Sequence, residues 1–378
     1  MHPPALRRIL LPLGVAAAML ATSVATPAQA RTEDRGAAPA VAAPAADRAA
    51  VVTDRLARQL SRLLADPAVA ERVRTAVAAG PVDLLTVEPG SAFARAAAAA
   101  NRSLLAAKGL SATDQSLLRL RLAHPDMLAA LERGDAPLVA AVPSDDAVTD
   151  VVAYDRSGTA IRLDGTRMPQ QPVLAVEVDV VRAMTLGLQL VRDTLAAHGL
   201  HAAAAEPKTA TVSATSGYWA NKVDAVRLSD DKEPWIKGAA EIFCIVGGFG
   251  LDGKVKIDIV QMPYLDHDGK TYYPNQLVVH YSAYKYNLAD VVMMEDDGDT
   301  NYQSLATALV NALLYIVDGG AYTPLVNAIL NAIPTSWWTD DPDYVDSWYT
   351  LATTTSGRRY GAAGNGWMDI SPYWVQAF

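Results

Sequence analysis

The chain has 378 residues and a formal net charge of -9, and 51% of its residues are hydrophobic. This length suits one or two domains with buried cores. The negative charge repels nucleic acid and anionic lipid, and the single cysteine, Cys244, excludes a disulfide within the chain.

Residues 1–30 have the pattern of a secretory signal peptide. Arg7 and Arg8 precede an apolar stretch at residues 9–21, and Ala28 and Ala30 give residues 28–30 the small-residue pattern of a cleavage site. The apolar stretch is too short for a membrane anchor, and no later stretch reaches about eighteen apolar residues. We therefore expect secretion after cleavage near Ala30 and no membrane span.

Composition divides the rest of the chain near Thr211. All seven tryptophans and fourteen of the fifteen tyrosines lie beyond this point. The part beyond Thr211 has 20 acidic and 10 basic residues, whereas residues 31–210 have 21 acidic and 20 basic residues. The predicted organisation is a disordered segment at 31–46, an α-rich domain with a small β element at 47–200, a linker at 201–212, and a β-sandwich domain at 213–378.

In the first half, apolar spacing predicts helices followed by strands. Asp66 and Pro67 form a cap and a first turn, and Ser111 is expected to cap a helix that turns Leu117, Leu118 and Leu120 inward. Helices are predicted at residues 47–65, 67–80, 91–108, from 111, at 125–131 and at 181–197. Strands are predicted at residues 137–142, 151–154, 160–163 and 172–178.

The second half alternates with period two, which is typical of antiparallel sheets with one buried face. Thr323 and Pro324 are expected to open a helix that ends at Ile333, and another helix is predicted at 302–317. Strands are predicted at residues 223–228, 241–246, 255–259, 277–286 and 290–295, with a last pair ending at Phe378. The predicted fold class is α+β, with a C-terminal antiparallel sandwich.

Four acidic stretches interrupt these strands, at residues 230–233, 266–268, 295–299 and 340–346. Calcium takes about six to eight oxygen ligands, often from aspartates on flexible loops. A helical calcium loop starting at Asp297 fails because Tyr302 and Ala308 occupy its glycine and glutamate positions. The candidate ligands of a composite calcium site are Asp230, Asp231, Glu233, Asp266, Asp268, Glu295, Asp296, Asp297 and Asp299. Solvated turns are the competing explanation.

Catalytic patterns are scarce. The chain has no Gly-x-Ser-x-Gly and no His-Glu-x-x-His pattern. Cys244 is either a buried inert thiol or a nucleophile, and Trp235 is either a buried plug or a sugar-stacking platform. If the protein is a hydrolase, His267 or His280 beside the acidic loops is the residue to test.

Several stretches resemble a known family. They lie at residues 228–235, 238–242, 262–269, 295–302 and 341–347, with similar runs at 118–123 and 134–139. These stretches resemble a secreted bacterial family, domain of unknown function 3103, which has no assigned activity. The second half is also similar in architecture to C2-like calcium-binding sandwiches, a likeness that licenses no function by itself.

Together these features predict an extracellular calcium-dependent binding module whose partner is a surface glycan or an extracellular protein. The alternative is a secreted hydrolase that uses loop carboxylates and a nearby histidine. A third possibility is that the first domain is a processing segment that is removed by a cut near Pro207.

Overall fold

The computed structural model describes most of the chain beyond the predicted signal peptide and disordered segment. It describes residues 45–111, 115–143, 148–202, 217–229, 235–238, 240–267, 269–296, 298, 300–333 and 344–376. Residues 43–378 form one compact unit. The fold class is α+β, as the sequence predicts. None of the described helices is long and apolar enough to cross a bilayer.

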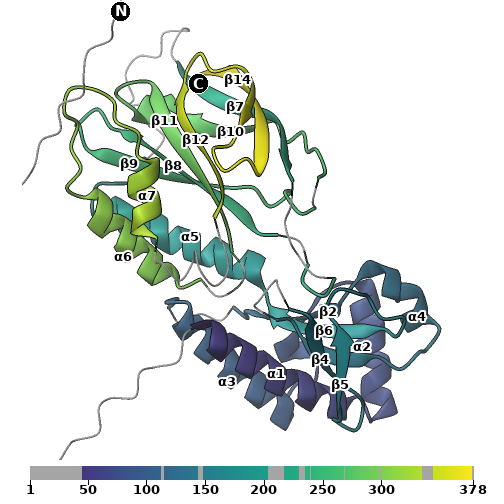
Figure 1. Ribbon diagram of the computed structural model, residues 1–378. Coiled ribbons are helices and arrows are strands. Elements are labelled where there is room, and N and C mark those ends of the chain that lie inside the picture. Colours follow the sequence, from purple (N-terminus) through teal and green to yellow (C-terminus); the bar gives the residue numbers. More distant parts are fainter. Residues whose placement is uncertain are drawn as a thin grey trace, which may run out of the picture. The chain divides into compact units, whose positions relative to one another are not determined.

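A six-stranded mixed sheet organises the first half (Figure 1). Its order is β1-β2-β6-β3-β4-β5, and only the β3–β6 pair is parallel. The strands are β1 (Val82–Asp83), β2 (Leu118–Leu122), β3 (Leu138–Ala141), β4 (Asp150–Tyr154), β5 (Ala160–Asp164) and β6 (Val173–Val178). The helices are α1 (Ala45–Leu63), α2 (Pro67–Ala79), α3 (Ala92–Ala107), α4 (Leu128–Glu132) and α5 (Val180–Ala197), with 3-10 turns at Leu84–Thr86 and Pro125–Met127.

Local signals fixed several of these boundaries. Asp66 accepts hydrogen bonds from the first backbone amides of α2, and Ser91 caps α3 in the same way. The hairpin of β4 and β5 is also confirmed. The helix predicted from Ser111 is wrong, because Leu118–Leu122 alternates leucine with arginine and forms β2.

Two four-stranded antiparallel sheets form the second half. Their orders are β10-β7-β14-β13 and β12-β11-β8-β9. The strands are β7 (Gly217–Leu228), β8 (Ile242–Phe249), β9 (Val255–Gln261), β10 (Gln276–His280), β11 (Leu288–Glu295), β12 (Tyr344–Ala352), β13 (Gly357–Tyr360) and β14 (Gly366–Gln376). The helices are α6 (Tyr302–Leu313) and α7 (Val326–Ala332), with a 3-10 turn at Tyr281–Ala283.

Several predicted boundaries in this half are wrong. The strand predicted at 223–228 begins at Gly217, and the helix predicted at 302–317 ends at Leu313. The strand expected to reach residue 286 ends at His280, where the 3-10 turn begins. The second helix starts at Val326 without a side-chain cap, so Thr323 does not open it. The amide of Leu325 instead donates to the buried carboxylate of Asp290 at 2.5 Å, which fixes the start of α7 through a distant strand.

The two sheets of the second half pack face to face. Val226 of β7 and Met368 of β14 share one core with Cys244 of β8 and Val291 of β11. The opposite face of the β8–β11 sheet is covered by α5, α6 and α7 (Figure 1). The order of layers is therefore sheet, sheet and helices.

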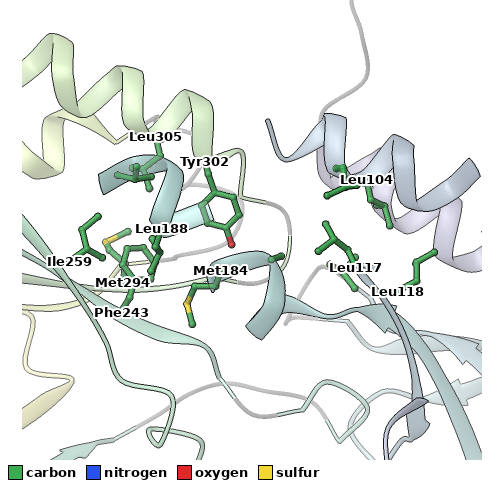
Figure 2. Close-up of a cluster of buried hydrophobic side chains, with 14 of the residues drawn as sticks. Leu104, Leu117, Leu118, Met184, Leu188, Phe243, Ile259, Met294, Tyr302 and Leu305 are labelled. Carbon is green, nitrogen blue, oxygen red and sulfur yellow. The ribbon is translucent and has the colours of Figure 1, made fainter. Parts of the chain in front are cut away.

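One hydrophobic core continues from the first half into the second. Leu104 and Leu117 belong to the same cluster as Leu188, Phe243 and Tyr302 (Figure 2). Helix α5, which the sequence assigns to the first domain, packs on α6. Beyond it, the amide of Ala202 donates to Ile257 of β9 at 2.8 Å. The predicted boundary at 201–212 falls largely outside the described residues, so it stays a prediction.

Gly187 of α5 allows the ring of Tyr302 to pack closely in this core. A Cβ atom at Gly187 would lie 2.1 Å from Cγ of Tyr302. A glycine-to-alanine change within a helix normally stabilises it by roughly 0.5–1 kcal/mol. Here the ring of Tyr302 would have to move, so overpacking reverses the sign.

We predict that Gly187→Ala lowers the free energy of unfolding by about 1–3 kcal/mol in urea denaturation. Gly319→Ala is the control, because nothing lies within 4 Å of a Cβ atom there. A Gly187→Ala protein as stable as the parent chain would contradict the close packing of Tyr302 on α5.

Candidate functional site

The β12-β11-β8-β9 sheet places the bases of three acidic loops at one end. β11 ends at Glu295, β8 begins at Ile242 and β12 begins at Tyr344. Their cross-strand partners are Glu295 with Ile242, Met294 with Tyr344, and Phe243 with Gln261, the last residue of β9. The loops after β9 and β11 and the loop before β12 therefore start from the same edge.

The other sheet brings a fourth acidic loop to this edge. β7 ends at Leu228, just before residues 230–233. The carbonyl of Leu228 accepts a hydrogen bond from Gly269 in the loop after β9, at 3.0 Å, and the amide of Ser229 donates to Asn365 at 2.8 Å. We call this shared edge, with the ends of β7, β9 and β11 and the start of β12, the acidic end of the sandwich.

Only part of the predicted metal set lies within the described residues. Asp266, Glu295 and Asp296 are described, whereas the other six fall outside: Asp230, Asp231, Glu233, Asp268, Asp297 and Asp299. Among the described residues, no group of three or more histidine, cysteine, aspartate or glutamate side chains is arranged to hold a metal ion. The composite calcium site therefore stays a prediction.

Asp266 lies in the turn after β9, where it holds a tyrosine. Its Oδ1 accepts a hydrogen bond from the hydroxyl of Tyr272 at 2.5 Å, and Nζ of Lys270 lies 3.9 Å from the same oxygen. Burial and the carboxylate of Asp266 raise the pKa of Tyr272, so this hydroxyl remains a donor at neutral pH. Asp266 therefore stabilises the turn after β9 by binding Tyr272.

Asp296 is fully buried at the base of the loop after β11. Its carboxylate accepts hydrogen bonds from the amide of Gly298, at 2.9 Å, and from the hydroxyl of Tyr302. Gly298 has a φ of 84°, and a Cβ atom there would lie 3.0 Å from Val180 at the start of α5. Glycine is therefore the residue that fits this turn.

Tyr302 joins the acidic loop to the first half of the chain. Its ring lies on Gly187 of α5, and its amide donates to the carbonyl of Lys108 at 3.0 Å. The neighbouring Asn301 donates to Ala107 at 2.7 Å and also caps α6 by accepting from Ser304. The end of α3 and the start of α6 are consequently fixed to each other.

Lys108 is an unusual cation in this region, because its side chain is only 2% exposed. Its Nζ lies 5.6 Å from the ring centroid of Tyr302, and it has no hydrogen-bond acceptor among the described residues. A cation over an aromatic ring gains about 0.5–2 kcal/mol. That gain does not match the cost of removing an ammonium group from water.

A second set of charges anchors the far side of the loop that contains residues 230–233. Arg121 of β2 donates to the carbonyl of Ile236 at 2.7 Å and also bonds the carbonyl of Lys237. Glu177 of β6 holds Arg121 at 2.8 Å. Trp235 donates to the carbonyl of Asp164 at 3.0 Å. The acidic loop after β7 is therefore fixed at its end by the first half of the chain.

Arg119 completes this group. Burial lowers the pKa of Arg119, but Glu177 and Asp179 outweigh burial and the net shift is upward. Arg119 Nη2 lies 2.5 Å from Glu177. Sequence reasoning missed these residues, although the alternation of leucine and arginine in β2 and the glutamate within the apolar β6 were available signals.

The other candidate residues lie elsewhere. His280 pairs with Ala220, eight positions along β7 from Leu228, which is roughly 26 Å from the acidic end. Its Nδ1 lies 3.0 Å from the hydroxyl of Tyr218, and burial lowers the pKa of the imidazole. Cys244 is fully buried, and burial raises the pKa of its thiol, as the inert-thiol interpretation predicts.

The fold and these contacts define an α+β protein with a two-sheet sandwich whose acidic loops leave from one end. The chain belongs to the family described as Protein of unknown function (DUF3103), whose model matches residues 48–377. No curated protein and no solved structure matches the chain.

Tyr302→Phe tests the bond that holds the base of the acidic loop. Removing the hydroxyl leaves a buried carboxylate oxygen of Asp296 without this donor, which costs about 1–3 kcal/mol. Urea denaturation should show that loss, and Asp296→Asn should reduce the additional cost of Tyr302→Phe. An unchanged stability in Tyr302→Phe would argue against the bond.

Lys108→Met tests the buried ammonium group. Methionine has a similar length and no charge, so we expect the free energy of unfolding to rise by about 1–3 kcal/mol. Lys270→Met is the matched control, because Lys270 is exposed and also lies over a tyrosine, Tyr272; it should stay within about 0.5 kcal/mol of the parent chain. A loss of stability in Lys108→Met would show that the charge is compensated.

Proposed function

We propose that this protein is an exported binding module whose acidic loops hold calcium at one end of the sandwich. A single observation carries the proposal. The strand register and the bond between Gly269 and Leu228 bring the bases of all four acidic stretches to the same end. Loops that are distant in sequence and rich in carboxylates therefore begin at neighbouring positions.

Charge accounts for the need for a cation. Asp230, Asp231 and Glu233 follow β7, and Asp297 and Asp299 follow β11. Carboxylates this numerous repel one another unless water or a cation compensates them. Calcium suits such a set because it accepts many oxygen ligands in flexible geometry.

In this proposal the described carboxylates Asp266 and Asp296 have a structural role. Asp266 and Asp296 already accept hydrogen bonds from Tyr272 and Tyr302. They would support the loops, and the other carboxylates of the acidic stretches would supply most of the oxygen ligands. The two stacked antiparallel sheets support this proposal, in which the sandwich is of the C2-like kind.

Export and the choice of partner belong to the same proposal. The pattern of residues 1–30 supports secretion, and the negative second half disfavours nucleic acid. Calcium would order the loops and allow them to contact a surface glycan or an extracellular protein. A hydrolase receives no support from His280, which lies far from the acidic end; His267 is the described histidine in the turn of Asp266.

Calcium should raise the melting temperature of the full chain. At about one hundred times the dissociation constant, binding stabilises the folded state by roughly 2.7 kcal/mol, which corresponds to several degrees. The measurement is a thermal melt in millimolar calcium chloride, in magnesium chloride and in a chelator. Calcium is expected to give the largest shift.

Matched variants identify the loops. Asp230→Asn/Asp231→Asn and Asp297→Asn/Asp299→Asn should each abolish the calcium shift, because each pair removes two ligands from one loop. Asp126→Asn/Asp135→Asn changes two exposed aspartates in the first half and should leave the shift intact. Equal melting temperatures in calcium and in the chelator would contradict the proposal.

A further inference from the structure

The outer face of the β10-β7-β14-β13 sheet combines exposed aromatic rings with paired charges. Met368 and Ile370 of β14 point into the core between the two sheets. Side chains alternate along a strand, so Trp367, Asp369 and Tyr373 lie on the opposite face. We call this row, with its cross-strand neighbours, the outer stripe.

The neighbours of β14 extend the stripe on both sides. On β13, Tyr360 pairs with Trp367 and Arg358 pairs with Asp369. On β7, Lys222 pairs with Ser371. Cross-strand partners share a face, and the contacts below agree with this assignment.

Four charged side chains of the stripe form two ion pairs, and Arg227, which pairs with Trp367 from β7, adds a fifth charge. Arg358 donates to Asp369 through Nε at 3.0 Å and Nη2 at 2.8 Å. Lys222 Nζ lies 2.8 Å from Asp224. Three cations against two carboxylates leave the stripe one positive charge in excess. Beyond Thr211 the chain has twice as many acidic as basic residues, so this nearly balanced face stands apart from its surroundings. It offers little electrostatic gain to an anionic or a cationic partner, which favours an uncharged one.

Aromatic rings lie at both ends of the charged middle. Tyr360 is 71% exposed and Tyr373 is 44% exposed. Trp367 and Tyr373 are six positions apart on β14, which is roughly 20 Å. Arg358 stacks 3.5 Å from the ring of Trp367, and Lys222 lies 5.7 Å from that of Tyr373, so the cations also keep the rings in place.

This arrangement disfavours other classes of partner. The centre of a protein–protein interface is usually depleted of charged residues, whereas four charged side chains occupy the middle of the stripe. Nucleic acid requires a net positive surface, and a membrane surface requires a basic or strongly apolar one. Sugar rings present an apolar face that can stack on an aromatic ring, and their hydroxyls can bond to carboxylate and guanidinium groups.

We propose that the outer stripe binds a neutral polysaccharide that lies along β14, with sugar rings stacked on Tyr360 and Tyr373. This inference rests on the proposed binding function and gives it a ligand class. The stripe begins beside the acidic end, because Trp367 pairs with Arg227, the residue before Leu228. Calcium and polysaccharide would therefore bind at neighbouring but separate places.

The test is affinity electrophoresis of the full chain in native gels. The gels contain one of three neutral polysaccharides, hydroxyethylcellulose, galactomannan or dextran, or the anionic polysaccharide alginate. At least one neutral polysaccharide should retard the protein. Tyr360→Ala and Tyr373→Ala should each weaken retardation about fivefold or more, since each removes one stacking ring. Both rings are exposed, so the melting temperature should not change.

Tyr315→Ala is the matched control, because Tyr315 is 83% exposed and lies after α6, away from the stripe; it should bind like the parent chain. The Tyr360 and Tyr373 variants should keep the full calcium shift in melting temperature. If the parent chain binds polysaccharide but calcium does not raise its melting temperature, the calcium site alone is refuted. No retardation by any neutral polysaccharide, retardation by alginate only, or a dimer that loses its association in Tyr360→Ala would overturn the inference.

Discussion

The burial of Tyr302 is the constraint on which the rest of the structure depends. Its ring can lie on α5 only because position 187 is glycine, its amide bonds the carbonyl of Lys108, and its hydroxyl bonds Asp296. One residue thus connects α3, α5, α6 and the loop after β11. A buried tyrosine of this size brings a large apolar gain together with a hydroxyl that needs a partner, and the acidic loop supplies that partner.

This constraint bears on the function. The loop after β11 is fixed at its base by Tyr302, and the loop after β7 is fixed at its end by Arg121, which holds the backbone at Ile236. Both anchors use residues of the first half, while the carboxylates belong to the second. If the first half were only a processing segment, its removal would expose Tyr302 and the shared core that includes Leu104 and Leu117. The contacts favour two halves that work as one unit.

Local patterns in the sequence were sufficient for much of the fold. Asp66 and Ser91 as caps, the hairpin of β4 and β5, and the alternating strands of the second half follow from neighbouring residues. The predictions failed mainly where contacts between residues distant in sequence determine the structure. Helix α7 starts where it does because Asp290 holds Leu325, and the arginines of Leu118–Leu122, whose alternation was a local signal that was missed, pair with the distant Glu177. For the same reason the roles of Lys108 and Tyr302 were not predictable, whereas the acidic stretches were visible as composition.

The most direct measurement is an anomalous difference map from a crystal grown in calcium chloride and recorded at a wavelength where calcium scatters anomalously. Our account predicts one strong peak at the acidic end of the sandwich, with carboxylate oxygens from both the 230–233 and the 295–299 stretches at about 2.3–2.6 Å. A map with no peak at this end, or with the two stretches on separate sides and each facing solvent alone, would contradict it.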